Sequence, residues 1–263
     1  MGKQLYVGVD VGSSFCKVAV VDADRKPVGW SCRRSGTDFT QSAQLGAQAA
    51  LDRAQATFDD VANCISTGYG RSNVAFTKGT KSEIGCHAKG AYFLFPMAIT
   101  IIDIGGQDNK VIVVNEKGER QKFMMNRKCA AGTGAFIEEQ SLRLRVDISE
   151  FDGLARQSTT PVEIASFCSV YAGTELLEKL RNGAKVPDIV RGIFVSVAKR
   201  ILAMASLSND PIVMTGGVVE HNPLVVDLMR ELSGGDIRVP QHPQLMGALG
   251  AALYAQEGAT GME

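Results

Sequence analysis

Residues 10–22 of the chain read DVGSSFCKVAVVD, and residues 103–115 read DIGGQDNKVIVVN. The two stretches align without a gap and share six of their thirteen residues. The sequence therefore contains an internal repeat. We predict that its two copies form the same local structure in two related parts of the chain.

Each copy of the repeat has the pattern of a β-hairpin. An apolar run ends in aspartate, at residues 5–10 and again at residues 99–103. A glycine-rich turn follows, and a second run rich in β-branched residues completes each unit. Two such runs joined by a glycine-containing turn predict a hairpin. A third strand, also followed by glycines, is predicted at residues 211–217.

Helical patterns separate these strands. Apolar residues recur at helical spacing within residues 47–58 and 189–205. An Asn-Pro pair at residues 222–223 is typical of a helix start. Strands that alternate with helices predict an α/β fold. We place one domain at residues 1–97 and a second at residues 98–263, whose last helix could pack back on the first domain.

The composition is that of a folded protein with balanced charge. The 263 residues include 28 Lys+Arg and 28 Asp+Glu, which give a net charge of +0. This balance argues against nucleic acid or a membrane surface as a partner. The sequence has neither a run of about 18 apolar residues nor a secretory signal pattern, so we expect a cytoplasmic protein. Its six cysteines are irregularly spaced, which favours reduced thiols or metal ligands over disulfides.

Asp10 and Asp103 are the predicted catalytic carboxylates. Each ends a buried strand and precedes glycines, whose backbone amides can approach phosphate oxygens. We expect the two carboxylates to hold Mg²⁺ through water, while Lys17 neutralises phosphate charge and Gln107 orients an attacking water. The other predicted nucleotide contacts are Gly12, Ser13, Ser14, Gly105, Gly106, Gly132, Thr133, Gly134, Gly216 and Gly217. The alternative is that both stretches are ordinary hairpins whose glycines only make turns.

Three segments resemble the motifs of a known superfamily. Residues 8–14, 103–108 and 214–218 are similar to the phosphate-1, phosphate-2 and adenosine motifs of the actin, sugar-kinase and heat-shock-protein ATPases, the ASKHA superfamily. The resemblance implies an actin-like ATPase fold. Such a fold has two ribonuclease-H-like domains with a nucleotide cleft between them.

Two cysteines stand apart from the other four. Cys129 precedes a Gly-Thr-Gly turn and a predicted helix, next to two basic residues, and Cys168 precedes a second helix-forming stretch, residues 174–181. A helix N-terminus and neighbouring cations favour the thiolate, which is the ligand that iron–sulfur clusters need. A 4Fe–4S cluster needs four such ligands, so two subunits related by a two-fold axis would have to share one cluster.

The alternative for these cysteines is that both are small buried hydrophobic residues, which is the common fate of a free cysteine. Their separation of 39 residues matches no ferredoxin pattern. Spacing alone therefore does not decide between a cluster ligand and a core residue.

Four segments are similar to one family within the superfamily. Residues 68–71, 86–91, 128–134 and 167–172 resemble signatures of the BadF/BadG/BcrA/BcrD-type ATPases, and the similarity runs from Val7 to residue 252. This family comprises activators of 2-hydroxyacyl-CoA dehydratases and ATPase subunits of benzoyl-CoA reductase. The resemblance implies an ATP-hydrolysing electron-transfer component whose Cys129 and Cys168 bind one 4Fe–4S cluster per dimer.

The same resemblance implies a set of partners. A second ATPase subunit, identical or related, completes the dimer. Reduced ferredoxin or flavodoxin supplies electrons, and an iron–sulfur reductase or dehydratase component accepts them. We expect ATP, ADP and Mg²⁺ as the other ligands.

One position departs from the family pattern. The expected segment is Cys-x-x-x-Ala-Glu-Ser-Glu, whereas this chain has Gly173 and Thr174 in place of the first Glu and the Ser. The difference leaves open a homodimeric activator, one subunit of a heteromeric benzoyl-CoA reductase, or the activator of a less familiar dehydratase or double-cubane reductase. Outside the family, the alternatives are a small-molecule kinase such as an N-acetylglucosamine kinase, without iron, and an actin-like or chaperone-like ATPase.

Overall fold

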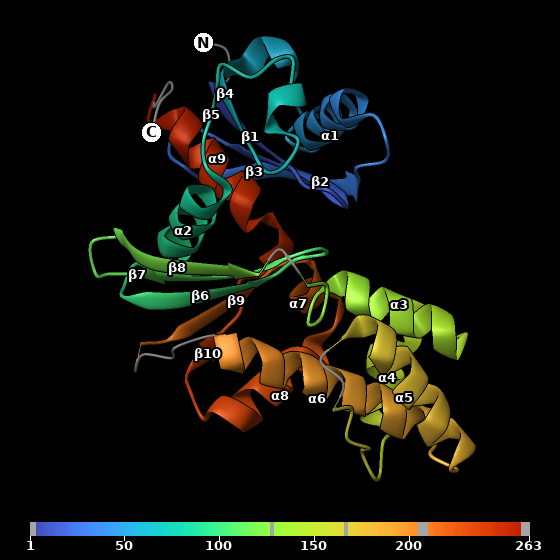
Figure 1. Cartoon of the computed structure of the whole chain (residues 1–263). Helices are drawn as coiled ribbons and strands as arrows, with labels where there is room; N and C mark the ends of the chain where they lie inside the picture. The colour runs from blue at the N-terminus through green and yellow to red at the C-terminus, as the bar shows by residue number, and fades with distance from the viewer. Residues whose placement is uncertain (1–3, 127–128, 166–167, 205–209, 259–263) are drawn as a thin grey trace. The chain divides into compact units, whose positions relative to one another are not determined.

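Each copy of the repeat forms two neighbouring strands in the computed structural model of the protein, which describes residues 4–126, 129–165, 168–204 and 210–258 (Figure 1). The strands are β1 Leu5–Val11, β2 Phe15–Val21, β3 Pro27–Arg34, β4 Val61–Thr67, β5 Gly79–Thr80, β6 Ile99–Ile104, β7 Asn109–Val114, β8 Arg120–Asn126, β9 Ile212–Thr215 and β10 Ile237–Arg238. The α-helices are α1 Phe39–Arg53, α2 Glu83–Leu94, α3 Gly134–Leu144, α4 Phe151–Arg156, α5 Ser169–Arg181, α6 Val186–Met204, α7 Gly217–His221, α8 Pro223–Ser233 and α9 Met246–Gln256.

The first sheet has the strand order β3-β2-β1-β4-β5. β1 and β2 pair antiparallel, whereas β1 and β4 pair parallel. Successive residues of β1 point to opposite faces, as strand geometry requires. Val7 and Val9 share a hydrophobic cluster with Ala50 of α1, whereas Gly8 faces α9. The first hairpin is therefore covered by helices on both faces.

Helix α9 lies directly on β1. A methyl group added at Gly8 would collide with the backbone of Ala248, and one added at Gly250 would collide with the carbonyl oxygen of Cys86 in α2. Glycine at these positions removes the side chains that would hold the backbones apart. The last helix of the chain thus shares a core with the first hairpin.

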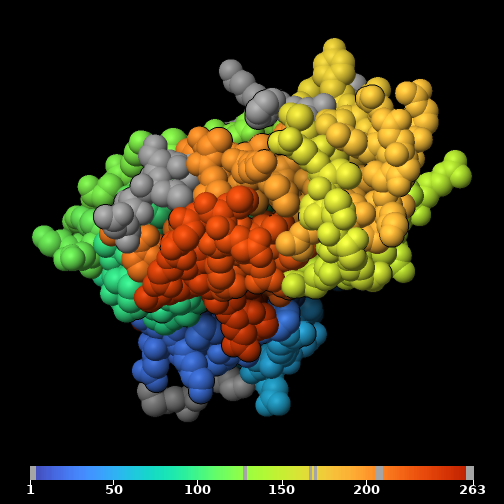
Figure 2. All heavy atoms as spheres, turned by 90° about the horizontal axis from the view of Figure 1, so that it is seen from below, coloured from blue at the N-terminus to red at the C-terminus, as the bar shows by residue number. Residues whose placement is uncertain are grey.

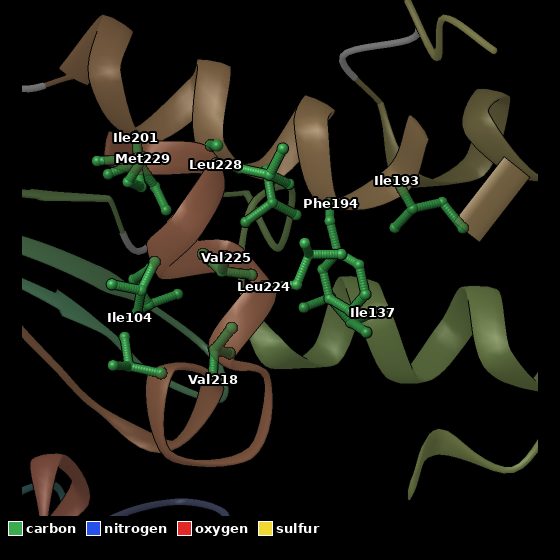
Figure 3. Packing of buried hydrophobic residues seen from close by; sticks show 14 of the residues in the cluster. Ile104, Ile137, Ile193, Phe194, Ile201, Val218, Leu224, Val225, Leu228 and Met229 are labelled. Carbon is green, nitrogen blue, oxygen red and sulfur yellow. The ribbon is translucent and has the colours of Figure 1, made fainter. Parts of the chain in front are cut away.

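The second sheet repeats the topology of the first. Its order is β10-β9-β6-β7-β8, so both sheets read 3-2-1-4-5 when their strands are numbered in chain order. Its core joins Ile104 of β6 and Ile137 of α3 to Phe194 of α6 and Val225 of α8 (Figure 3). Helices α6 and α8 pack side by side, as the orange and red-orange parts of Figure 2 show.

The chain divides into two compact units. The first comprises the chain up to Ala98, residues 114–121 and the chain from Gln244 onward, and the second comprises residues 99–113 and 122–243. Each unit contains one five-stranded sheet covered by helices. The predicted α/β fold class is confirmed.

Two helices begin or end at other residues than the sequence pattern predicts. Only residues 47–53 of the predicted stripe belong to α1, because the helix ends at Arg53 and Phe58 begins a separate 3-10 helix, Phe58–Asp60. Helix α1 also begins earlier than the stripe, because the Asp38 side chain accepts a hydrogen bond from Gln41 N and caps the helix. The stretch at residues 174–181 belongs to α5, which begins directly after Cys168. No helix within the four described ranges is both long and apolar enough to cross a membrane.

Candidate nucleotide and cluster sites

Asp10 lies near the end of β1 and is fully buried. Lys17 Nζ lies 2.8 Å from Asp10 Oδ2, because the antiparallel pairing sets the two residues opposite each other. The other oxygen, Oδ1, has no hydrogen-bond partner among the residues that the structure describes. A buried carboxylate oxygen without a donor is costly unless a water or ligand supplies one. Asp10 is therefore suited to holding a water ligand of a cation.

Two glycines make room beside this carboxylate. A methyl group at Gly68 would collide with Asp10 Oδ1, and one at Gly247 would lie 2.8 Å from Asp10 Oδ2. Gly68 also has a φ of +87°, which disfavours any other residue. Mg²⁺ keeps several of its waters when it is bound and needs such space. The residues present therefore fit a magnesium ion held through water by Asp10.

The predicted phosphate-binding turn, Gly12 to Ser14, joins β1 to β2. Gly12 N donates a hydrogen bond to Phe15 O at 3.0 Å, which closes the turn. Ser13 is exposed at its tip and Ser14 is half-buried. The Ser35 hydroxyl donates to Gly12 O at 2.6 Å and holds the turn against the end of β3. The turn is thus a fixed structure next to Asp10, and a role in phosphate binding stays a prediction.

Asp103 occupies the equivalent position in β6 of the second unit, with 3% of the residue exposed. Lys110 Nζ lies 3.3 Å from its Oδ2, and Thr215 Oγ1 donates a hydrogen bond to its Oδ1 at 2.9 Å. Asp103 is therefore linked both to the second hairpin and to β9. Thr215 ends β9 directly before Gly216, whose φ is +100°, and Gly217 begins α7.

Lys110 is a residue of this site that the sequence reasoning did not select. Its side chain is 2% exposed, and its Nζ also lies 2.6 Å from Asp108 Oδ1. The repeat aligns Lys110 with Lys17, so the alignment contained the signal. Two carboxylates around one buried ammonium leave a net negative charge, which favours a cation at this position. The second hairpin therefore has the same aspartate–lysine pair as the first.

The second hairpin turn is hydrogen-bonded to the Gly-Thr-Gly turn that precedes α3. Gly134 N donates to Gly105 O at 2.9 Å, and Ala135 N donates to Gly106 O at 2.8 Å. Asn109 Nδ2 donates to Gly132 O at 2.9 Å. The predicted phosphate residues Gly105 and Gly106 thus lie against the start of the helix that follows Cys129.

The remaining predicted residues of these two turns differ in exposure. Gln107 is exposed at the tip of the second hairpin, where a side chain can reach a bound water or phosphate. Thr133 is buried and forms the N-cap position of α3, after Gly132 with a φ of +86°. Thr133 therefore shapes the turn, because its backbone N–H and its hydroxyl both donate hydrogen bonds to Ala130 O, whereas Gln107 offers its side chain to a ligand.

Cys129 and Cys168 both lie in the second unit and both are exposed. Their exposure excludes the alternative of two small core residues. Cys168 is the N-cap residue of α5, whereas Ala130 to Thr133 separate Cys129 from α3. The positive end of a helix dipole acts within the first turn, so it acts more directly on Cys168. Two accessible thiols, Cys168 at the start of α5 and Cys129 in the segment before α3, are a donor set that fits an iron–sulfur cluster.

Three of the other cysteines are buried and differ from Cys129 and Cys168 in exposure. Burial raises the pKa of the Cys16, Cys64 and Cys86 thiols to about 12. They are structural residues that stay protonated near neutral pH. Cys32 is exposed on β3 of the first unit.

Comparison with known proteins decides the family. The model of the BadF/BadG/BcrA/BcrD ATPase family matches residues 7–255, which is almost the whole chain. The chain belongs to the BadF/BadG/BcrA/BcrD ATPase family. This membership confirms the resemblance that the glycine-rich and cysteine segments indicate.

Two relatives are similar to this chain over nearly the whole length of both proteins. The activator of lactoyl-CoA dehydratase from Anaerotignum propionicum is 41% identical over 260 residues, which cover 96% of this chain and 98% of the relative. The crystal structure of (R)-2-hydroxyglutaryl-CoA dehydratase component A from Acidaminococcus fermentans has a TM-score of 0.92 at 38% identity, and covers 98% of this chain and 100% of that one.

A second solved structure contains a nucleotide analogue. It is the activator of the 2-hydroxyisocaproyl-CoA dehydratase from Clostridium difficile with bound ADPNP, which has a TM-score of 0.89 at 38% identity and covers 97% of this chain and 96% of that one. These similarities confirm the predicted actin-like ATPase fold. They do not favour the small-molecule kinase alternative.

Gly173 marks the departure of this chain from the BadF family pattern. A methyl group at Gly173 would lie 2.6 Å from the guanidinium carbon of Arg143. Arg143 belongs to α3 and also lies 2.8 Å from Glu139 on the same helix. The space that a larger residue at position 173 would fill is thus occupied by an arginine. Arg143 links α3 to α5, the two helices that follow Cys129 and Cys168.

Proposed function

We propose that this protein is the homodimeric activator of a 2-hydroxyacyl-CoA dehydratase. In this role it hydrolyses ATP and passes single electrons from reduced ferredoxin or flavodoxin to the iron–sulfur dehydratase component. The observation that carries the proposal is the exposure of two thiols in the same unit, Cys168 at the start of α5 and Cys129 in the segment before α3. Relatives named as dehydratase activators at about 40% identity support the same role.

The number of ligands argues for a dimer. Each chain offers two exposed cysteines in its second unit, and a 4Fe–4S cluster takes four cysteine ligands. A two-fold axis brings the same surface of both subunits together, so Cys129 and Cys168 of each protomer would complete one set. Such a cluster would store and release single electrons at low potential.

The two hairpins divide the work of ATP hydrolysis. Asp10 would hold Mg²⁺ through water, and Lys17 would neutralise phosphate charge beside it. Asp103, paired with Lys110, would supply the second carboxylate. Gln107 would orient the water that attacks the γ-phosphorus, while the bond to the β,γ-bridging oxygen breaks and ADP leaves. Positioning and charge stabilisation account for most of the catalysis in this kind of reaction.

The contacts of the second hairpin connect this chemistry to the cysteines. Gly105 and Gly106 accept hydrogen bonds from Gly134 and Ala135, the first residues of α3. A change of the hairpin on phosphate release would therefore act directly on α3 and on the turn that carries Cys129. Arg143 would pass such a movement on to α5 through its contact with Gly173. ATP turnover would in this way make electron transfer directional.

Anaerobic purification of the chain expressed alone tests the proposal. We expect a brown dimer with about four irons and four sulfides, since each protomer brings two ligands. Cys129→Ser should lose this iron while still binding ATP, whereas the matched control Cys32→Ser should keep it. Full iron content in Cys129→Ser would exclude the ligand assignment. An iron-free chain that gains its cluster only with a second, related ATPase subunit would replace the homodimer with a heteromer.

A further inference from the structure

Arg200 is a half-buried cation near the end of α6, in the same unit as both proposed cluster ligands. Its stem packs against the turn after Cys129, because a methyl group at Gly132 would lie 3.6 Å from Arg200 Cβ and 3.7 Å from its Cδ. Its guanidinium carbon lies 5.2 Å from the ring centroid of Phe136, a fully buried residue in the first turn of α3. The side chain is thus held in place by the turn that follows Cys129 and by the first turn of α3.

The charge of Arg200 lies within electrostatic reach of both cysteines. Burial lowers the pKa of the guanidinium, and attraction to Cys129, Cys168 and Glu175 raises it. Arginine keeps its proton in proteins, so the group is a permanent positive charge. Glu175 belongs to α5 and accepts a hydrogen bond from Ala165 N at 3.0 Å, which places a carboxylate in the same neighbourhood. The adjacent cation, Lys199, has a different partner, because its Nζ lies 3.5 Å from Glu163 Oε1.

We propose that Arg200 is an electrostatic positioning residue for the cluster, a fixed cation that faces the Cys129 and Cys168 thiolates and raises the reduction potential of the group they bind. This inference rests on the proposed function. A dimer would bring two such arginines to one cluster. Each stabilises the additional negative charge that one electron brings, and partial burial strengthens the effect.

A purely structural role is the competing explanation. Arg200 could serve only to brace Gly132 and Phe136, in which case its size and shape would matter but its charge would not. Charge and shape can be separated by substitution. Arg200→Met keeps most of the stem and removes the charge, whereas Arg200→Lys keeps the charge and loses the planar group. Lys199→Met removes one charge from the adjacent position and is the matched control.

The first measurement is an anaerobic redox titration of the iron-loaded dimer. We expect the equilibrium constant for reduction to fall by on the order of tenfold in Arg200→Met, a shift of about 59 mV for a one-electron couple. Arg200→Lys and Lys199→Met should stay close to the wild type. An unchanged midpoint in Arg200→Met with full iron content would overturn the proposal. A wild-type protein without iron would instead refute the proposed function.

A second measurement does not need the cluster. The iron-free protein is alkylated with iodoacetate, which is negatively charged, and with neutral iodoacetamide, and site-specific rates are read by mass spectrometry. The ratio of the two rates reports the local charge. We expect this ratio to fall severalfold at Cys129 and Cys168 in Arg200→Met, with no change at Cys32 and no change in Arg200→Lys. Equal ratios in the wild type and Arg200→Met would show that Arg200 does not act on these thiols.

Discussion

Single residues of the same type have different chemistry in this protein, and the cysteines show it most clearly. Cys129, in the segment before α3, and Cys168, at the start of α5, are exposed, whereas Cys16, Cys64 and Cys86 lie in the core. Sequence context separated the first pair from the rest, because a Gly-Thr-Gly turn and a helix-forming stretch follow them. It did not select Arg200, whose closeness to Gly132 depends on a helix that comes much later in the chain.

The thiols should differ in reactivity in the iron-free, folded protein. At pH 8, a thiol whose pKa is about 12 has almost no thiolate, and burial also blocks the reagent. We therefore expect iodoacetamide to label Cys32, Cys129 and Cys168, and to label the three buried cysteines only after unfolding. Peptide mass spectrometry over a time course measures this. Rapid labelling of Cys86 in the folded protein would contradict the assigned core.

Lys110 should matter for stability as well as for ATP hydrolysis. Lys110→Met leaves Asp103 buried without its ammonium partner, which should lower the free energy of unfolding by about 3 kcal/mol. Adding Asp103→Asn removes the unpaired charge and should recover most of this loss, although ATP hydrolysis stays lost. Urea unfolding and phosphate release measure the two effects. A single Lys110→Met variant as stable as the wild type would show that the buried pair contributes nothing.

At the level of elements, the strands of the two hairpins, β9 and the longer amphipathic helices could be predicted because their patterns are local. The hairpin at residues 5–21 depends on neighbouring residues alone. Helix α8 begins at Pro223 after Asn222, as predicted, but its first turn is capped by the distant Asp152, whose Oδ1 accepts a hydrogen bond from Leu224 N at 2.7 Å. The close contact of α9 with β1 and α2 is different. In this contact Gly8 and Gly250 pack against backbone segments that are distant from them in the sequence. The spacing of apolar residues does not predict which distant segment a glycine contacts.

Two glycine substitutions should have opposite effects for this reason. Gly250→Ala places a methyl group on the Cys86 carbonyl oxygen in the closely packed α9–α2 contact, and we expect a loss of about 3 kcal/mol or failure to fold. Gly153→Ala adds a methyl group to an exposed position of α4 with nothing within 4 Å, and should stabilise the protein by about 0.5–1 kcal/mol. Thermal unfolding of both variants checks the sign. A stabilised Gly250→Ala variant would refute the close packing.

At the level of the whole molecule, the repeat in the sequence corresponds to two units with the same strand order, and each unit carries one aspartate–lysine hairpin. The second unit alone adds the two exposed cysteines, Arg200 and the helices that join them. Duplication therefore explains the ATPase parts of the protein, whereas the proposed cluster site belongs to segments inserted between β8 and β9. The repeat in the sequence could therefore reveal the two hairpins, but it could not reveal the proposed cluster site.

Native mass spectrometry under anaerobic conditions is the most direct test of the central proposal, that two protomers share one cluster through Cys129 and Cys168. We predict a dimer whose mass exceeds that of two chains by one set of four irons and four sulfides. Removal of the iron by a chelator should return the mass to that of the protein alone. A monomer that carries a complete cluster, or a dimer with one cluster in each protomer, would contradict it.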